Sequence, residues 1–241
     1  MRKLLILTAM LALVGMTMTS CSDDDTTAAG SGSGGGTTPN ISNGYEYVDL
    51  GLSVKWATCN VGASQPYEYG DYFAWGETEA KSDYSWSTYK YGTYEFDTSS
   101  NMTKYCTSSS YGTVDNKTTL EAADDAATAN MGGKWRMPTK AELDELCKQC
   151  TWTWYDEGNT EFNGVAGHKV TGTNGKSIFL PAAGYRYGTS LYSAGSVGEI
   201  WSASLNEGGP YSAYLVSFTW DWIAWSYYRC YGHTVRAVLP E

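Results

Sequence analysis

The sequence predicts an α+β fold, with two helices near the middle of the chain and short antiparallel sheets and long ordered loops around them. Three features of the 241 residues predict it. Apolar residues follow helical spacing near residues 139–150, and short alternating stretches towards both ends are typical of strands. Gly, Ser, Tyr and Thr dominate the stretch that ends near residue 113, which indicates loops. We expect one domain without internal repeats over residues 41–241.

The first elements expected are a strand pair and a helix. Residues 45–56 (YEYVDLGLSVKW) alternate in the manner of two strands that are broken at residues 49–51. The helix is expected from Thr118 to Asn130, because Thr118 and Glu121 have capping-box spacing and the middle is rich in Ala. Two glycines after Met131 are expected to end it.

A second helix is expected after the segment WRMPT. Thr139 and Glu142 again have capping-box spacing, and Pro138 fixes the entry of the chain. Trp135 is expected to pack in the core just before this helix. The apolar side chains that follow form one stripe at positions i, i+3, i+4 and i+7: Leu143, Leu146, Cys147 and Cys150.

The remaining strands are expected in the C-terminal part of the chain, with Gly-rich turns between them. They are Ser177–Leu180, Ile200–Ser204, Tyr214–Phe218 and Thr234–Leu239. Trp201 and Phe218 are expected inside the domain. Arg236 is expected to be a buried or half-buried member of an ion pair rather than a ligand contact.

The N-terminus has the features of an export signal. Arg2 and Lys3 precede a 13-residue apolar run, shorter than the roughly 20 residues of a membrane-spanning helix, so residues 1–20 are expected to be a signal peptide. The segment MTSC resembles a bacterial lipobox, with Met18 in place of the usual Leu, in which Cys21 is lipidated. The Ser and three Asp that follow resemble the signal that sends lipoproteins of Bacteroides-like bacteria to the cell surface. Residues 21–40 are expected to be a lipidated flexible linker.

Composition argues against several classes of function. Removal of the signal peptide takes the formal net charge from −10 to −12, and an acidic chain without a Lys/Arg cluster does not favour nucleic acid. The carboxylates are scattered, as on a solvated surface, and no triad, phosphate loop or metal motif is present in the sequence. The sequence therefore predicts no enzyme activity, no metal and no cofactor.

The cysteines favour a structural role. Cys147 and Cys150 have the spacing of a redox pair, but they lie at the C-terminal end of their helix, where the dipole does not stabilise a thiolate. A place in the core is therefore expected for both. Five cysteines remain besides Cys21, an odd number, so at least one is expected to be unpaired or to pair with another chain.

The C-terminal part of the chain is rich in aromatic residues. Ten of the 31 residues from Trp201 to Tyr231 are aromatic, about twice the 15% of the whole chain. The stretch SFTWDWIAWSYYRCYGH, residues 217–233, is expected to fit no regular strand or helix. Its Trp, Tyr, Ser, Asp and His are typical of binding faces, where rigid rings give contact area and polar neighbours give hydrogen bonds. Most of residues 220–231 are therefore expected outside, with core packing left open for some.

Several motifs occur in order along residues 45–239: YVDLGLSVKWATCNVGA, YGDYFAWGE, GGKWRMPTKAELDEL, SIFLPAAGYR and the pair IWSAS and GHTVRAV. They resemble the Fibrobacter succinogenes major paralogous domain, which is abundant in surface lipoproteins of Bacteroides-like bacteria. That family is similar to the C-type lectin-like fold, in the branch that also holds the formylglycine-generating enzymes. The resemblance implies a C-type lectin-like ligand-binding domain over residues 41–241.

The same fold displays the variable region of proteins that are diversified by retroelements. Residues 201–204 and 235–238 frame a stretch that resembles this region, and most residues between them are encodable by Asn codons with replaced adenines. Trp220, Trp222 and Trp225 are not. A paralogue with the same frame and no retroelement would have the same amino acids, so the resemblance leaves diversification open.

Two activities of related proteins are not implied. The formylglycine-generating enzymes use a pair of nearby cysteines, whereas Cys230 stands alone in this region. Sugar-binding C-type lectins use a Glu-Pro-Asn or Gln-Pro-Asp calcium motif together with Trp-Asn-Asp, and the sequence has none of these. Calcium-dependent sugar binding is therefore not expected.

The expected function is recognition. We expect a lipoprotein on the cell surface, held in the outer membrane by lipid on Cys21, that binds an external protein, glycan or phage component through its C-terminal aromatic stretch. The residues expected to contact the ligand are Tyr211, Trp220, Asp221, Trp222, Ile223, Trp225, Ser226, Tyr227, Tyr228, Tyr231 and His233.

Two alternatives stay open. A structural component of the surface or of an appendage would be favoured by an exposed sheet edge or a donor strand. An enzyme would be favoured by a concave cluster of carboxylates or by His168 beside a cysteine.

Overall fold

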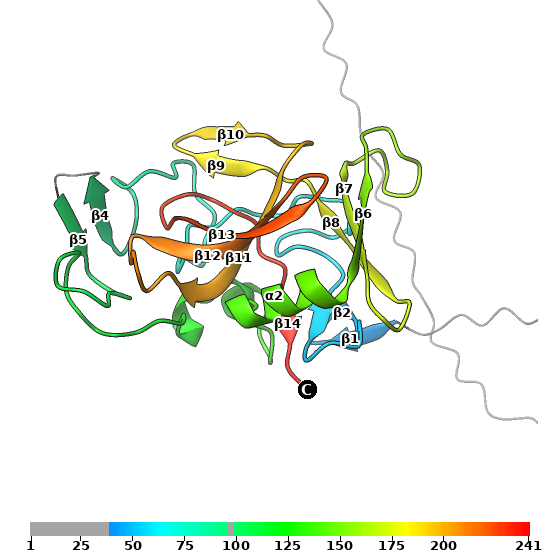
Figure 1. Ribbon diagram of the computed structural model, residues 1–241, viewed down its shortest axis with the longest axis horizontal. Helices are drawn as coiled ribbons and strands as arrows, with labels where there is room; N and C mark the ends of the chain where they lie inside the picture. Colours follow the sequence, from blue (N-terminus) through cyan, green and yellow to red (C-terminus); the bar gives the residue numbers. More distant parts are fainter. Residues whose placement is uncertain (1–38, 96–98) are drawn as a thin grey trace, which may run out of the picture. The chain divides into compact units, whose positions relative to one another are not determined.

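The computed structural model describes residues 39–95 and 99–241. The expected signal peptide, Cys21 and all but the end of the expected linker lie outside the described residues. The described residues form an α+β domain that is mostly sheet, with two α-helices and many short strands (Figure 1). Within these ranges no helix is long and apolar enough to cross a membrane. The coarse prediction of an α+β fold is confirmed.

The elements follow one another from β1 to β14. The first strands are β1 (Asn40–Ser42), β2 (Tyr45–Val48), β3 (Lys55–Ala57), β4 (Gly92–Glu95) and β5 (Ser99–Met102). The helical part comprises the 3-10 turn η1 (Ala122–Asp124), α1 (Ala126–Met131) and α2 (Lys140–Gln149). The later strands are β6 (Thr151–Tyr155), β7 (Gly167–Thr171), β8 (Ser177–Pro181), β9 (Tyr185–Tyr187), β10 (Ser190–Tyr192), β11 (Gly198–Leu205), β12 (Ser212–Phe218), β13 (Trp222–Tyr228) and β14 (Val238–Leu239).

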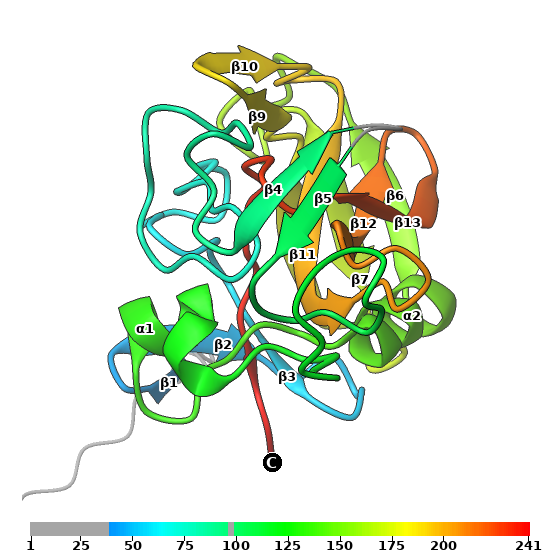
Figure 2. The same cartoon turned by 90° about the vertical axis from the view of Figure 1, so that its left-hand side faces the viewer.

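The strands form small antiparallel sheets. The sheet β1-β2-β3-β14 joins the two ends of the domain, because Val238 of β14 pairs with Trp56 of β3. The strands β6, β7 and β8 form a second sheet, and β11, β12 and β13 form a third. The hairpin β4–β5 stands beside the end of this third sheet where β12 begins and β13 ends, as Figure 1 and Figure 2 both show.

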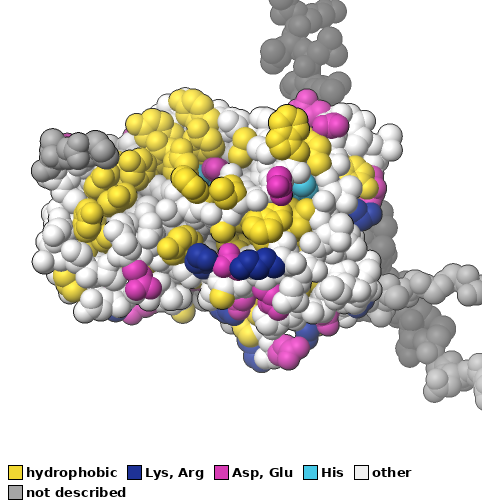
Figure 3. Space-filling model, in the orientation of Figure 1, with side chains coloured by type: hydrophobic (Ala, Val, Ile, Leu, Met, Phe, Trp, Pro, Cys, Tyr) yellow, Lys and Arg dark blue, Asp and Glu magenta, His cyan; other side chains and the backbone are white. Residues whose placement is uncertain are grey.

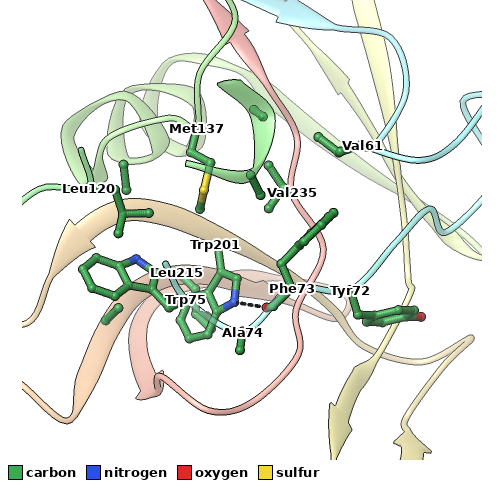
Figure 4. Close-up of a cluster of buried hydrophobic side chains, with 14 of the residues drawn as sticks. Val61, Tyr72, Phe73, Ala74, Trp75, Leu120, Met137, Trp201, Leu215 and Val235 are labelled. Carbon is green, nitrogen blue, oxygen red and sulfur yellow. Dashed lines mark hydrogen bonds between the residues drawn. The ribbon is translucent and has the colours of Figure 1, made fainter. Parts of the chain in front are cut away.

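The β11-β12-β13 sheet has core on both of its faces. On one face, Ile200, Val216 and Phe218 pack with Leu143 and Leu146 of α2. The other face packs against a larger cluster, part of which Figure 4 shows: Trp201, Leu215, Trp75, Phe73, Leu120, Met137 and Val235. The indole Nε1 of Trp201 donates to the carbonyl of Phe73 at 2.8 Å, which satisfies the polar atom of a fully buried ring. The predicted burial of Trp201, Phe218 and Trp135 is confirmed.

The second expected helix is confirmed together with its capping box. The Thr139 side chain accepts from the backbone N–H of Glu142, and the Glu142 carboxylate accepts from the N–H of Thr139. The expected stripe faces the core, with Leu143, Leu146 and Cys147 buried and Cys150 packed against the same cluster.

The first expected helix is shorter than residues 118–130, and its expected cap is wrong. Helix α1 begins at Ala126, and Asp125 caps it by accepting from the N–H of Thr128. The preceding segment is held elsewhere: the Asp124 carboxylate binds the hydroxyls of Tyr91 and Tyr105 and the Lys104 ammonium. These contacts outweigh local helix propensity, so residues 118–121 run as irregular chain and bridge.

The expectation that the aromatic stretch forms no regular strand is wrong. Residues 222–228 are β13, and every one of them pairs with a residue of β12, from Phe218↔Trp222 to Ser212↔Tyr228. A turn at residues 219–221 fixes this register, with the N–H of Thr219 donating to the carbonyl of Asp221. The strands expected at 177–180, 200–204 and 214–218 are found, whereas only residues 238–239 of the last expected strand have strand geometry.

Two expectations about charged residues are corrected: the expected ion pair of Arg236 and the expected exposure of the carboxylates. Arg236 is fully buried, but its partners are Asn60 Oδ1 and the carbonyls of Ala57, Thr58 and Phe179 rather than a carboxylate. Burial lowers the pKa of Arg236 to about 10. The carboxylates are not all on the surface either, because four of them are buried: Glu77, Asp124, Asp125 and Glu199.

Candidate binding face

A continuous series of aromatic rings crosses one side of the domain. Each ring has its centroid between 4.1 and 6.3 Å from that of a neighbour in the series. We call this set the aromatic band: Tyr111, Tyr211, Tyr94, Trp86, Tyr228, Tyr227, Tyr231, Tyr185, Tyr187 and Tyr192. Figure 3 shows hydrophobic side chains gathered over β9, β10 and β13, where part of the band lies.

Separate segments of the chain build the aromatic band. The hairpin β4–β5 and its flanks give Trp86, Tyr94 and Tyr111, the hairpin β9–β10 gives three tyrosines, and the rest come from residues 211–231. The sequence-based prediction found Tyr211, Tyr227, Tyr228 and Tyr231. It missed the other six, because nothing in the local sequence places residues 86–111 and 185–192 beside β13.

The predicted contact residues fall into three groups by exposure. Trp220, Ile223 and Trp225, which we call the exposed trio, are 87%, 52% and 56% exposed, and Asp221 is exposed beside them. Six residues are half-buried: Tyr211, Trp222, Ser226, Tyr227, Tyr228 and Tyr231. Trp222 turns towards the α2 side of the sheet, whereas Tyr227, Tyr228 and Tyr231 pack against the larger core cluster.

His233 does not belong to the exposed surface. Its side chain is fully buried, and its Nδ1 lies 2.9 Å from the Glu199 carboxylate. The Trp201 ring packs edge-on against it with centroids 4.3 Å apart, and its backbone pairs with Phe73. The expectation that His233 orients an external ligand by contact is therefore wrong; the residue lies beneath Tyr227 and Tyr231.

A small recess lies between Trp225, one member of the exposed trio, and the aromatic band. It has a volume of about 280 Å³, and Trp225, Tyr211, Tyr227 and Tyr228 contribute to its lining. Its polar lining is neutral and already bonded internally, since the amide of Asn206 donates to the hydroxyls of Ser212 and Ser226 at 3.1 and 3.2 Å. The recess offers ring surfaces and hydroxyls to a ligand, without a charged group in its lining.

A larger recess lies away from the aromatic band. It has about 450 Å³ and is lined by backbone and side chains of β2, β3 and residues 58–66. Cys59 is part of its wall, but no member of the band is. Volume alone therefore does not identify the binding site, and the placement of the aromatic residues favours the smaller recess.

A buried arginine fixes the C-terminal end of β13. Arg229 is fully buried, and its guanidinium donates to the carbonyls of Tyr105, Pro210 and Lys104 and to the hydroxyl of Tyr89. It also lies 4.9 Å from the centroid of the Trp75 ring. Because these bonds tie β13 to residues 104–105, they hold the β13 and β4–β5 parts of the aromatic band in one arrangement.

Three tyrosines of the aromatic band, Tyr94, Tyr227 and Tyr231, are neutral hydrogen-bonding groups. Burial raises the pKa of Tyr227 and of Tyr94 to about 12, and burial also raises the pKa of Tyr231. At neutral pH these hydroxyls stay protonated. A ligand therefore meets rings whose hydroxyls both donate and accept hydrogen bonds.

The remaining candidate groups do not form a reactive cluster within the described ranges. Burial raises the pKa of Cys147 to about 12 and of Cys150 to about 11, so both thiols stay protonated at neutral pH. All five cysteines described are free of disulfides. His168 packs against Trp152, Trp154 and Phe218, and residues 39–95 and 99–241 hold no group of three potential metal ligands.

Comparisons of the chain with models of protein families, with curated proteins and with solved structures found no match.

Proposed function

We propose that this protein is a recognition protein of the cell surface, held in the outer membrane by lipid on Cys21. Its ligand-binding surface is the aromatic band together with the exposed trio. The observation that carries the proposal is the aromatic band itself: ten rings from separate segments lie in one series and are partly exposed.

The finer fold and the export route belong to the same proposal. The motifs over residues 45–239 support a C-type lectin-like fold. The lipobox-like segment at Cys21 and the acidic residues after it support display outside the cell. A flexible linker then lifts the binding face away from the lipid surface.

Recognition by such a face follows from the chemistry of its side chains. Tyr and Trp bury much apolar area and lose few rotamers when a ligand covers them. The band is also preorganised, because its rings stack on one another and Arg229 fixes the end of β13. Rings that are already ordered before binding add affinity without a further entropic cost.

The test uses ligand panels and matched variants. The purified full-length chain is screened against an immobilised glycan panel and a phage-displayed peptide library, and the selected ligands are titrated against variants. Tyr187→Ala and Trp225→Ala remove exposed rings of the proposed face, whereas Tyr45→Ala removes an exposed ring from β2 as the matched control.

We expect a selected ligand to lose roughly tenfold or more in affinity with Tyr187→Ala or Trp225→Ala, as interface anchors do, and to bind Tyr45→Ala unchanged. Ligands that bind all three variants alike, or two panels without any ligand, would contradict the proposal.

A second candidate, a structural component of the surface or of an appendage, is favoured by one observation. β13 is the outer strand of its sheet and carries exposed apolar residues. Its test is the mass of the purified chain in light scattering over rising concentration. Ordered assemblies that Ile223→Lys abolishes would support this candidate; a monomer at all concentrations would contradict it.

A further inference from the structure

The strand β13 pairs on one side only. It is the end strand in the order β11-β12-β13, and all seven of its residues pair with β12. In an antiparallel pair the backbone groups of alternate residues point away from the partner. Among the described residues, backbone groups of β13 bond to something other than β12 only at its two ends: the N–H of Trp222 donates to Asp221 Oδ1, and the carbonyl of Tyr228 accepts from the N–H of Tyr231.

The middle of β13 is exposed on both faces of the sheet. Ile223 and Trp225 are exposed on one face, and Ala224 is exposed on the other. Its neighbour β12 is different, because most of its residues are buried. An added strand next to β13 would therefore have room for its side chains above and below the sheet.

The usual protections of a sheet edge are missing from β13. Natural edge strands carry a Lys, a Pro or a bulge that prevents another strand from pairing. The sequence of β13, WIAWSYY, has no Lys and no Pro, and its register with β12 runs without a shift. An unprotected edge strand of seven residues favours aggregation unless a partner strand covers it.

The charges around β13 favour a basic partner. From Asn206 to Tyr228 the only charged residues in the sequence are Glu207 and Asp221, and both are exposed. Arg229, which follows β13, is buried, and Lys140 of α2 lies over the Tyr214 ring of β12. Asp221 directly precedes β13, and Glu207 lies in the turn next to its other end. The ring faces of Trp225 and Tyr228 also attract cations. The chain has 16 Lys and Arg against 26 Asp and Glu, so a basic partner is the better source of these cations.

We propose that an extended, basic segment of polypeptide binds this protein by adding a strand to the free edge of β13. Backbone hydrogen bonds to β13 give the affinity, Lys or Arg side chains meet Asp221, Glu207 and the rings, and apolar side chains cover the exposed trio. The inference rests on the proposed function, because it names the class of ligand that the binding face takes.

A second copy of the chain fits this edge less well. In a symmetric antiparallel pair of two β13 strands, Asp221 of one copy approaches the end where Glu207 of the other copy lies. Two chains with a net charge of −10 each also repel one another. Charge complementarity therefore favours a basic segment over self-pairing.

The test uses a fluorescent peptide of about eight residues that alternates Lys and Val, long enough for one strand. Its binding to the full-length chain is measured by anisotropy at low salt. The comparison peptides are the same sequence with Glu in place of Lys, and the Lys-Val sequence methylated at every backbone nitrogen, which cannot donate to a sheet edge. We expect both to bind at least tenfold more weakly.

The matched protein variants are Ile223→Lys and Ile41→Lys. Both residues are exposed on strands, 52% and 63%, but Ile41 lies on β1, the end strand of a different sheet. We expect Ile223→Lys to weaken the Lys-Val peptide at least tenfold and Ile41→Lys to leave it unchanged, with both variants melting like the parent.

Each outcome separates the inference from the proposed function. Equal binding of the methylated and unmethylated peptides would overturn strand addition. The proposed function would survive, because the face would still bind a peptide. A glycan that binds in a Trp225-dependent way, with no binding of the Lys-Val peptide, would overturn the inference and keep the proposed function. If the chain associates with itself and Ile223→Lys abolishes this association, the partner of the β13 edge is a second copy of the chain, and the inference is wrong. Absence of any ligand would contradict both proposals.

Discussion

At the residue scale, the tryptophans of the C-terminal part have opposite environments. Trp220 and Trp225 project from the sheet, whereas Trp201 is fully buried and bonded to the Phe73 carbonyl. We expect Trp220→Ala and Trp225→Ala to change the free energy of unfolding by about 0.5 kcal/mol or less. Trp201→Ala is expected to cost about 3–5 kcal/mol.

Thermal and urea unfolding of the three variants measure this difference. Phe218→Ala is the second core control, because Phe218 packs under the α2 side of the same sheet. If Trp220→Ala and Trp225→Ala unfold as easily as Trp201→Ala, the exposed trio is part of a core and the binding-face proposal fails.

Also at the residue scale, His168 makes stability depend on pH. Its Nε2 lies 2.5 Å from the carbonyl of Thr219, and its Nδ1 is buried without a hydrogen-bond partner among the described residues. Burial lowers the pKa of His168 below its ordinary value of 6.5, although the charge of Asp221 opposes this. The neutral ring is therefore favoured in the folded protein.

The sign of the effect follows from linkage. Because the folded protein binds this proton less readily than the unfolded chain, the stabilisation is fully present above about pH 6.5 and is lost as the pH falls towards the folded-state pKa. His168→Gln keeps an N–H for the Thr219 carbonyl but cannot titrate. We expect the parent to lose more melting temperature than His168→Gln between pH 7.5 and pH 5. If the melting temperatures of the two proteins fall equally with pH, the protonation of His168 does not affect stability.

At the element scale, two threonines with the same sequence signature have different roles. Thr139 caps α2 with both bonds of a capping box, whereas Thr118 lies in irregular chain far from the start of α1. We expect Thr139→Ala to lower the free energy of unfolding by about 1 kcal/mol and Thr118→Ala to lower it less. Urea unfolding of the two variants measures this, and an equal loss in both would contradict the assigned caps.

The same comparison shows how far elements follow from the sequence. Helix α2 was predicted because its cap and its apolar stripe lie within a dozen consecutive residues. Helix α1 was predicted too long because Asp124 is held by Tyr91, Lys104 and Tyr105, which are 19 to 33 residues away. β13 was missed as a strand because its regularity comes from pairing with β12, not from its own residue pattern.

At the scale of the whole molecule, the proposed display outside the cell depends on lipidation of Cys21. A radiolabelled fatty acid is expected to enter the protein and to be lost in Cys21→Ala. Protease added to intact cells is expected to release the domain by cutting in the Gly- and Ser-rich part of the linker, residues 26–39. Cells that keep the full-length protein through this treatment, with the label absent, would place it elsewhere.

The candidate face also depends on the whole molecule. Composition alone pointed to the aromatic stretch, and Tyr211, Tyr227, Tyr228 and Tyr231 do lie in the aromatic band. Six further rings arrive from residues 86–111 and 185–192, and no periodicity within those segments indicates that they meet β13. His233, in contrast, was predicted in the binding face but is buried. The residues next to it in the sequence give no sign that Phe73 and Trp201 cover it.

Local sequence was enough to predict the α+β class, the second helix with its cap and stripe, the burial of Trp135, Trp201 and Phe218, and the region where aromatic residues concentrate. These features follow from local spacing and from the apolar character of single residues, which do not depend on distant parts of the chain. Three features required the folded arrangement: which rings join into the aromatic band, which charges are buried, and the free edge of β13. Each of these depends on partners far away in the chain, and hydrogen bonds and burial formed with such partners outweigh local preference.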